Sequence, residues 1–243
     1  ERWLVAAVNP EVDAIEIALV ALGGRVITRR RLEVDSPTVA QSVAIIADAV
    51  TEMAAEHRAS AVLRVGVAVP GIVRSSDGVI RLAPHLGWKE SPFAEKLGDR
   101  LGMPVVVAND AQLGCRAEFI FGAGIGARNL VYVNGGPSGI GGGVIIDGKI
   151  VGGRDGYAGE IGHISVNPVG PACACGASGC LEALLRREHL LEVLGLKQAE
   201  DAELAAGARR NRPHHAHGGR LAGAVRAEES KHLTAGNGEV DAA

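Results

Sequence analysis

The densest group of metal-ligating side chains in the sequence is one histidine followed by three cysteines. Cys173, Cys175 and Cys180 lie within eight residues, and His163 precedes the first of them by ten. Zinc binds four ligands in a tetrahedron, commonly thiolate and imidazole, and this set leaves no open position for catalysis. The spacing therefore predicts a structural zinc site rather than a disulfide framework, which would spread its cysteines. The alternative is unrelated small core cysteines beside a surface histidine. Cys115 lies among helix-forming residues and is expected to be buried.

A second candidate is the pair Asn109–Asp110, which follows the apolar run Val105–Ala108. Ligands of open α/β sheets collect beyond the carboxyl ends of strands, so polar side chains are well placed there. Asp110 could accept a proton from a hydroxyl group while Asn109 orients the same substrate. The alternative is an ordinary loop dipeptide that caps the following helix.

Two glycine-rich stretches follow. Glu160 and His163 lie three residues apart in the first, just before the cysteines. A metal-bound imidazole can hydrogen-bond a ligand hydroxyl through its other ring nitrogen, so the metal would stiffen a ligand-binding loop. The second stretch, residues 135–143, could offer the amides of Gly139, Gly141 and Gly142 to a phosphate. No G-x-x-x-x-G-K-[ST] sequence occurs there, so a structural turn is at least as good an interpretation.

These residues need strands and helices to position them. Alternating or continuous apolar residues predict strands at Trp3–Val8, Ile15–Val20, Arg25–Arg31, Val62–Val69, Val105–Ala108, Leu130–Val133 and Gly143–Ile146. Helices are expected from an N-cap at Ser36 with Pro37 in the first turn, at Ala111–Phe119 and at Leu181–Leu194. The run Val62–Val69 is expected to be covered on both faces. The order of elements predicts a mixed α/β sheet with packed helices, and a second unit beginning near Leu130.

Composition narrows the function classes. Of 243 residues 34 are glycine, and the formal net charge is −3, which argues against nucleic-acid binding by bulk electrostatics. No apolar stretch approaches the ~20 residues of a membrane helix, and no secretory leader is visible, so a cytoplasmic location is expected. The chain begins at Glu1, as a fragment would. Residues 207–243 lack sustained periodicity and are expected to form a poorly ordered tail.

Taken together, the motifs resemble the ROK family of bacterial sugar kinases and sugar-responsive repressors. The resemblance rests on Asn109–Asp110, Gly139–Gly143, Gly156–His163 and Cys173–Glu182, and it runs from about Trp3 to Leu194. It implies an actin-like (ribonuclease H-like), two-lobed α/β fold. The lobes would be residues 1–118 and 119–206, the second one incomplete, followed by the atypical tail.

The resemblance also implies roles for individual residues. A sugar pocket would be formed by Gly71, Asn109, Asp110, Glu160, His163 and Glu182. In the kinases, the aspartate at the position of Asp110 deprotonates the sugar hydroxyl that attacks the γ-phosphate. The zinc ligands would be His163, Cys173, Cys175 and Cys180.

The sequence departs from the family's kinases at the first turn. The kinases carry an Asp-x-Gly-Gly-Thr loop for ATP phosphates and magnesium, where this chain has Asn9-Pro10-Glu11-Val12-Asp13. The missing glycines and the added carboxylates are unfavourable beside a triphosphate. We therefore expect the sugar-binding effector domain of a ROK-type regulator, forming a homo-oligomer and contacting DNA only through a helix-turn-helix segment absent from this chain. The alternatives are an active ATP- and magnesium-dependent sugar kinase resembling glucokinase, and a truncated relative whose reading frame shifts near Ala208.

Overall fold

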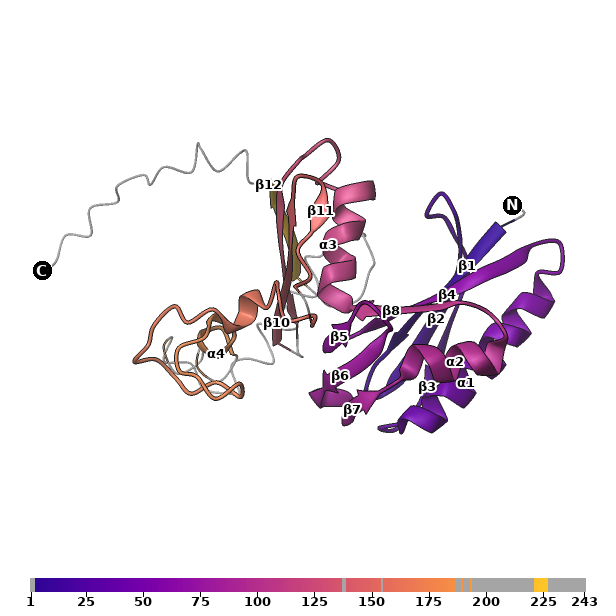
Figure 1. Cartoon of the computed structure of the whole chain (residues 1–243), viewed down its shortest axis with the longest axis horizontal. Helices are drawn as coiled ribbons and strands as arrows, with labels where there is room; N and C mark the ends of the chain where they lie inside the picture. The colour runs from indigo at the N-terminus through magenta and orange to yellow at the C-terminus, as the bar shows by residue number, and fades with distance from the viewer. Residues whose placement is uncertain are drawn as a thin grey trace, which may run out of the picture.

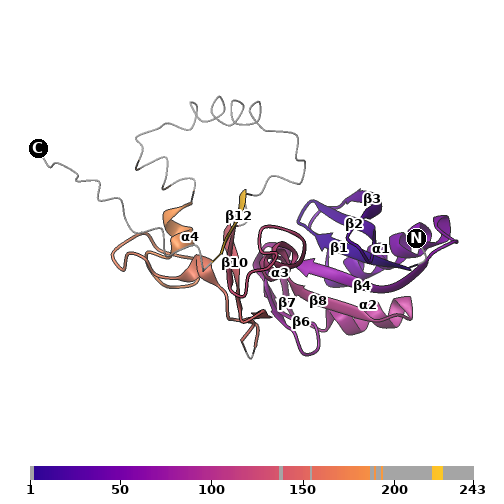
Figure 2. The ribbon, with the colours of Figure 1, turned by 90° about the horizontal axis from the view of Figure 1, so that it is seen from above.

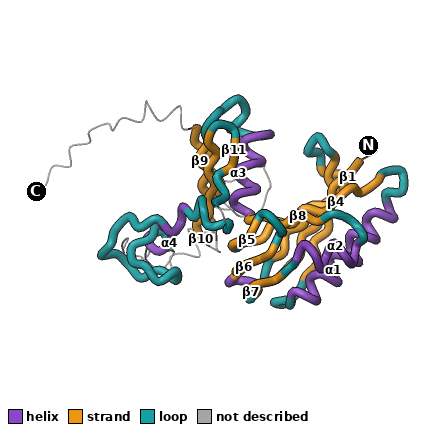
Figure 3. The backbone as a smooth tube through the Cα atoms, in the orientation of Figure 1, coloured by secondary structure: helices purple, strands orange, loops and turns teal. Residues whose placement is uncertain are grey.

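The described part of the chain folds around two larger β-sheets, each with its own helices (Figure 1). The computed structural model describes residues 3–136, 139–153, 155–186, 189, 193 and 221–226. A smaller three-stranded sheet accompanies the first sheet, and a mostly non-helical segment around the cysteines extends from the second (Figure 3). The mixed α/β class predicted from the sequence is confirmed. No helix in the described part of the chain is long and apolar enough to cross a membrane.

The first sheet has the strand order β3-β2-β1-β4-β8. Its strands are β1 (Trp3–Pro10), β2 (Ala14–Ala21), β3 (Val26–Glu33), β4 (Ala61–Val69) and β8 (Val105–Asn109). The first three strands form an antiparallel meander, and β4 and β8 are parallel to β1. Helices α1 (Val39–Glu56) and α2 (Phe93–Leu101) pack side by side on one face, where the main hydrophobic core lies (Figure 1). The parallel strands bring the carboxyl ends of β4 and β8 to the same edge.

The prediction that both faces of the run Val62–Val69 are covered is wrong. Val65, Val67 and Val69 are buried against the helices, but Leu63 is 42% exposed. A Cβ added at Gly66 would meet no atom within 4 Å, so this face of the strand is open. A continuous apolar run does not distinguish a strand buried on one face from one buried on both.

The start of α1 also differs from the prediction. The N-cap is Thr38 rather than Ser36, whose backbone has a φ of 44°. The Thr38 hydroxyl accepts a hydrogen bond from the amide of Gln41 (3.3 Å), and the Gln41 side chain accepts one from the Thr38 amide (2.9 Å). This capping box satisfies two backbone donors at once, which a cap at Ser36 would not.

The small sheet contains β5 (Ile72–Arg74), β6 (Val79–Ala83) and β7 (Trp88–Ser91), with a 3-10 turn η1 (Pro84–Leu86) between the last two. The Trp88 ring stacks on Phe93 at a centroid distance of 5.1 Å, and its indole nitrogen donates to the carbonyl of Pro37 (3.0 Å). These contacts tie the small sheet to α1 and α2.

The second sheet has the order β11-β10-β9-β12. Its strands are β9 (Leu130–Gly136), β10 (Gly139–Ile146), β11 (Lys149–Ile150) and β12 (Leu221–Arg226). It repeats the antiparallel meander of the first sheet. Strand β12 pairs with the free edge of β9, so these six residues of the expected tail form a strand, because an open strand edge supplies backbone partners. The other residues of 207–243 lie outside the described residues, as does most of the expected helix Leu181–Leu194, of which α4 (Leu181–Leu184) is described.

The candidate phosphate loop is a strand. Gly139, Gly141 and Gly142 belong to β10, and the turn itself, residues 137–138, lies outside the described residues. Gly141 and Gly143 let helix α3 (Asp110–Phe121) approach one face, where an added Cβ would lie 2.8 Å from the Cβ of Ala111 and 2.5 Å from that of Cys115, respectively.

Gly142 serves the opposite face, where its Cβ would lie 2.5 Å from Ile161. Alternate glycines therefore allow close packing on both sides of one strand. Helix α3 lies on the side of this sheet that faces the first sheet (Figure 1 and Figure 2). The expected lobe boundary at 118/119 falls inside this helix.

The substitution Gly143→Ala is expected to lower the free energy of unfolding by about 1–3 kcal/mol, because the added methyl group would overlap the Cys115 side chain and overpack the interface. Gly152→Ala is the matched control, since a Cβ there would meet nothing within 4 Å. Urea denaturation of both variants measures the difference. Equal unfolding free energies for the two would contradict the packing role of Gly143.

Candidate metal and ligand site

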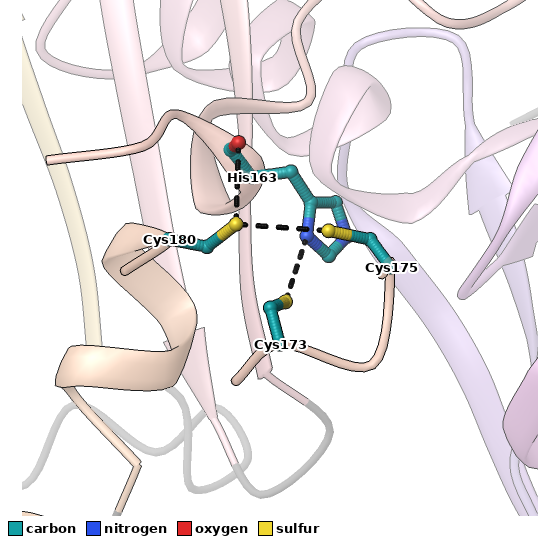
Figure 4. Close-up of side chains that lie close together, drawn as sticks. All are labelled: His163, Cys173, Cys175 and Cys180. Atoms are coloured by element: carbon teal, nitrogen blue, oxygen red, sulfur yellow. Dashed lines mark hydrogen bonds between the residues drawn. The ribbon is translucent and has the colours of Figure 1, made fainter. Parts of the chain in front are cut away.

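The histidine and the three cysteines predicted as ligands converge in the structure (Figure 4). His163 ends the 3-10 turn η2 (Ile161–His163), and Cys180 is the N-cap of α4. The four ligand atoms all lie within 4.8 Å of one another. The sulfur of Cys173 lies 3.5 Å from His163 Nδ1, and the sulfurs of Cys175 and Cys180 lie 3.6 Å apart.

This geometry fits a tetrahedral metal. Zinc–sulfur bonds of about 2.3 Å require ligand atoms about 3.8 Å apart at the corners of the tetrahedron. The separations of 3.5 Å and 3.6 Å are close to that value, the other separations are at most 4.8 Å, and Nδ1 is the imidazole atom that lies beside the sulfur of Cys173. Two residues shape the loop: Gly176 has a φ of 94°, and a Cβ at Gly179 would collide with the carbonyl oxygen of Asn167.

The pKa values of two thiols of the cluster are shifted in opposite directions. Burial raises the pKa of Cys180 to about 12, and a backbone hydrogen bond at Ala177 is the first of several that lower the pKa of the exposed Cys175. Because a metal binds the thiolate, loading the cluster would release the proton of Cys180. Cys115 lies apart from the cluster and is buried, as predicted, and its burial raises its pKa to about 11.

Asn109 and Asp110 lie where β8 meets α3. The Asn109 side chain accepts a hydrogen bond from the amide of Gln112 (2.9 Å), so it caps the helix. Its amide group also donates to the carbonyl of Gly71 (2.9 Å), which brings the ends of β4 and β8 together. An Asp110 carboxylate oxygen accepts from the amide of Ala111 (2.8 Å). The capping interpretation is therefore correct for Asn109, and it coexists with a position at the carboxyl ends of two strands.

Gly71 has a steric reason to be glycine. A Cβ at this position would collide with the carbonyl oxygen of Leu82 and lie 2.8 Å from Cα of Ala83. The residue therefore allows the end of β4 to pass close to β6.

Glu160 begins the turn that carries His163 and is partly buried. Burial raises the pKa of Glu160 above its ordinary value; Asp110 and Glu182 raise it further, and His163 lowers it. The charges of His163, Asp110 and Glu182, three further residues selected from the sequence, therefore act on Glu160. A carboxyl group in such surroundings is suited to hydrogen-bonding a polar, uncharged ligand.

Glu182 connects the metal segment to the second sheet. Its carboxylate accepts a hydrogen bond from the amide of Ile140 in β10 (3.0 Å). A Cβ at Gly139, which has a φ of 119°, would collide with the same carboxylate. Thus Gly139, selected as a phosphate ligand, makes room for a carboxylate.

The turn after β1 is closed by one side-chain and one backbone hydrogen bond. Asn9 donates to a carboxylate oxygen of Glu11 (2.9 Å), and the Glu11 amide donates to the carbonyl of Ala14 (2.7 Å). Arg31 forms ion pairs in this region with four carboxylates, those of Glu11, Asp13, Glu16 and Glu33. The pairs are exposed and add little stability, but one guanidinium among four carboxylates leaves a formal charge of −3.

Two residues that connect distant parts of the chain, one at this turn and one in α3, were not selected from the sequence. Arg31 sits in a strand 18 residues after Asp13, and Gln112 binds the carbonyl of Ala158, 46 residues away. No motif or periodicity marks either residue, because both act through contacts that only the folded chain creates.

Comparison with known proteins identifies relatives of two kinds. The ROK family model matches residues 5–215. A glucokinase from Halalkalibacterium halodurans is 32% identical over 211 residues, covering 84% of this chain and 63% of the glucokinase. A xylose repressor from Bacillus subtilis is 31% identical over 191 residues, covering 77% of this chain and 49% of the repressor.

The solved structures that resemble this chain also include both a transcriptional regulator and a kinase. A ROK family transcriptional regulator, a homologue of the E. coli MLC protein, superposes with a TM-score of 0.67 and 26% identity, over 87% of this chain and 51% of the regulator. A ROK family glucokinase from Streptomyces griseus, solved with glucose and AMPPNP, has a TM-score of 0.66 and 31% identity, over 84% of this chain and 65% of the glucokinase. The chain thus spans about half to two thirds of the length of these relatives.

Proposed function

This chain belongs to the ROK family, whose members among its relatives include both repressors and glucokinases, and we propose that it is the sugar-binding effector part of a ROK transcriptional regulator. The sugar is the signal rather than a substrate. Its binding between the two sheets shifts their relative orientation, and a DNA-binding segment outside this chain responds to that shift.

The proposed pocket uses the residues around Glu160. The carboxylates of Asp110, Glu160 and Glu182 accept hydrogen bonds from sugar hydroxyls, and Asn109 and Gly71 form the wall at the carboxyl ends of β4 and β8. The raised pKa of Glu160 supports a ligand without negative charge. His163 directs Nδ1 towards the sulfurs, which leaves Nε2 for a hydroxyl group of the sugar.

The proposed metal is a structural zinc ion held by His163, Cys173, Cys175 and Cys180. Four protein ligands complete its tetrahedron, so the ion supplies cross-linking and no chemistry. The support is the convergence of the four ligand atoms within 4.8 Å. The ion would fix the orientation of the His163 ring and thereby the turn that carries Glu160.

The turn between β1 and β2 is the observation that favours a regulator over a kinase. Phosphoryl transfer depends on positioning and on neutralising charge at the phosphates. Here the turn offers the carboxylates of Glu11 and Asp13, and the side chain of Asn9 is bound to Glu11. These carboxylates repel a triphosphate. Asn9 also lacks the negative charge that the aspartate of the family's kinases provides near the metal.

A sugar kinase is the second candidate, favoured by one observation. Asp110 lies at the end of β8 beside Asn109, where a base for a sugar hydroxyl is needed. ATP and magnesium would then be required as cosubstrate and cofactor. The similarity to glucokinases, at 31–32% identity, is as strong as that to the xylose repressor.

Sugar binding is tested by thermal unfolding with a panel of hexoses, N-acetylated hexosamines and xylose. A sugar that binds the folded chain at ~100 times its Kd is expected to raise the unfolding midpoint by several degrees. The Glu160→Gln variant keeps the shape of the side chain but loses the acceptor charge, so it should show a clearly smaller rise. If no sugar raises the midpoint of the unmodified chain, the effector proposal fails.

A further inference from the structure

We propose that Gln112 is a positioning residue for the loop 152–163, and that it sets the sugar affinity without contacting the sugar; this rests on the proposed function. His163 is the last residue of this loop, and Glu160 lies three residues before it. The metal would hold the His163 end. The hydrogen bond from Gln112 to Ala158 would hold the loop on the other side of Glu160.

The contact that carries the proposal is a partly buried hydrogen bond from the side chain of Gln112. Gln112 is 8% exposed, and its side-chain amide donates to the carbonyl oxygen of Ala158 (3.2 Å). Its backbone amide is bound to the Asn109 side chain (2.9 Å). One residue therefore joins the Asn109–Asp110 end of α3 to a loop residue two positions before Glu160.

The loop needs such a tether because its backbone is intrinsically free. Gly153, Gly156 and Gly159 all adopt positive φ angles, of 68°, 86° and 90°. Glycine loses the most conformational entropy on ordering, so each external contact matters. Glu160 lies between the tether at Ala158 and the metal ligand His163, and fixing both sides restricts where its carboxylate can point.

A second feature limits the loop to one path. A Cβ at Gly156 would collide with the carbonyl oxygen of Val73 in β5. The loop is thus pressed against the small sheet at Gly156 and bound to α3 at Ala158. Gln112 supplies the directional part of this arrangement, since the Val73 contact is purely steric.

The test compares Gln112→Met, which keeps the length of the side chain and removes the amide, with Gln112→Asn, which is too short to reach Ala158 and guards against misfolding of the first variant. The control is Gln41→Met, which removes a hydrogen bond between a glutamine side chain and the backbone at the exposed start of α1, where Gln41 accepts from the amide of Thr38. All are full chains with their metal content measured. Hydrogen exchange of residues 156–163 and sugar affinity are the two measurements.

In both Gln112 variants the loop amides are expected to exchange their hydrogens faster, and the sugar is expected to bind about 3- to 10-fold more weakly. This is the range expected for the loss of one hydrogen bond. Metal content and the Gln41→Met chain should match the unmodified chain in both measurements. Unchanged loop exchange in the Gln112 variants overturns the proposal, as does faster exchange with unchanged affinity. If the loop loosens but the unmodified chain binds no sugar, the positioning role stands and the proposed function fails.

Discussion

Removal of the metal proposed for His163 and the three cysteines is expected to unfold residues 161–183 while the first sheet remains intact. The buried apolar cluster of this segment contains Cys173, Cys180 and Ala183, far fewer residues than the core beneath the first sheet. Small segments with so little core depend on a cross-link. Structural zinc contributes about 10–16 kcal/mol of apparent binding free energy in small zinc-dependent folds, so its loss here should dominate the local stability.

Removal of the metal should also lower the sugar affinity at least tenfold, because the turn that carries Glu160 and the helix that carries Glu182 both adjoin the cluster. Cys173→Ser is the test variant, and Cys115→Ser is its control, since Cys115 lies in the separate cluster beneath α3. Elemental analysis measures the metal content, limited proteolysis measures the unfolding of residues 161–183, and calorimetry measures the sugar affinity. Full sugar affinity in a chain verified to be metal-free would contradict this coupling.

Transfer of the γ-phosphoryl group from ATP to a sugar hydroxyl, with release of ADP, is expected to be at least about a thousandfold slower than in a ROK glucokinase assayed under the same conditions. The contribution of correctly placed phosphate-binding groups to phosphoryl transfer is of this order or greater. The turn after β1 presents Glu11 and Asp13 in the place of such groups, and Arg31 is engaged with carboxylates.

A coupled assay of ADP release with magnesium and each sugar that binds measures this rate. Asp110→Asn is the internal control, because a kinase would lose its base in this variant whereas a background activity would not change. ADP release that depends on sugar and disappears in Asp110→Asn would establish the kinase and overturn the effector proposal. Equal, near-zero rates in both chains are the expected result.

Local sequence was sufficient for the strands of the two larger sheets up to β10 and for most of helix α1, and it predicted that His163 and the three cysteines would gather. The strands and the apolar stripe of α1 follow from the spacing of apolar residues, since strand and helix periods are local properties. The proximity of Cys173, Cys175 and Cys180 could be predicted because one short loop carries all three. Capping was less predictable, because Ser36 and Thr38 are both good cap residues and the choice depended on Gln41.

Only the tertiary structure decided what the glycines and the polar connectors do. Gly141 and Gly143 have the composition of a phosphate loop, yet they lie in β10 because helix α3, some 30 residues earlier in the chain, packs onto them. Gln112 meets Ala158, and Arg31 meets Asp13, across distances in sequence that no periodicity spans. The sequence by itself determined which chemical groups this protein carries, because residue type and local spacing are written along the chain. Which groups face one another was decided by packing, because long-range contacts arise only when the two sheets and α3 come together.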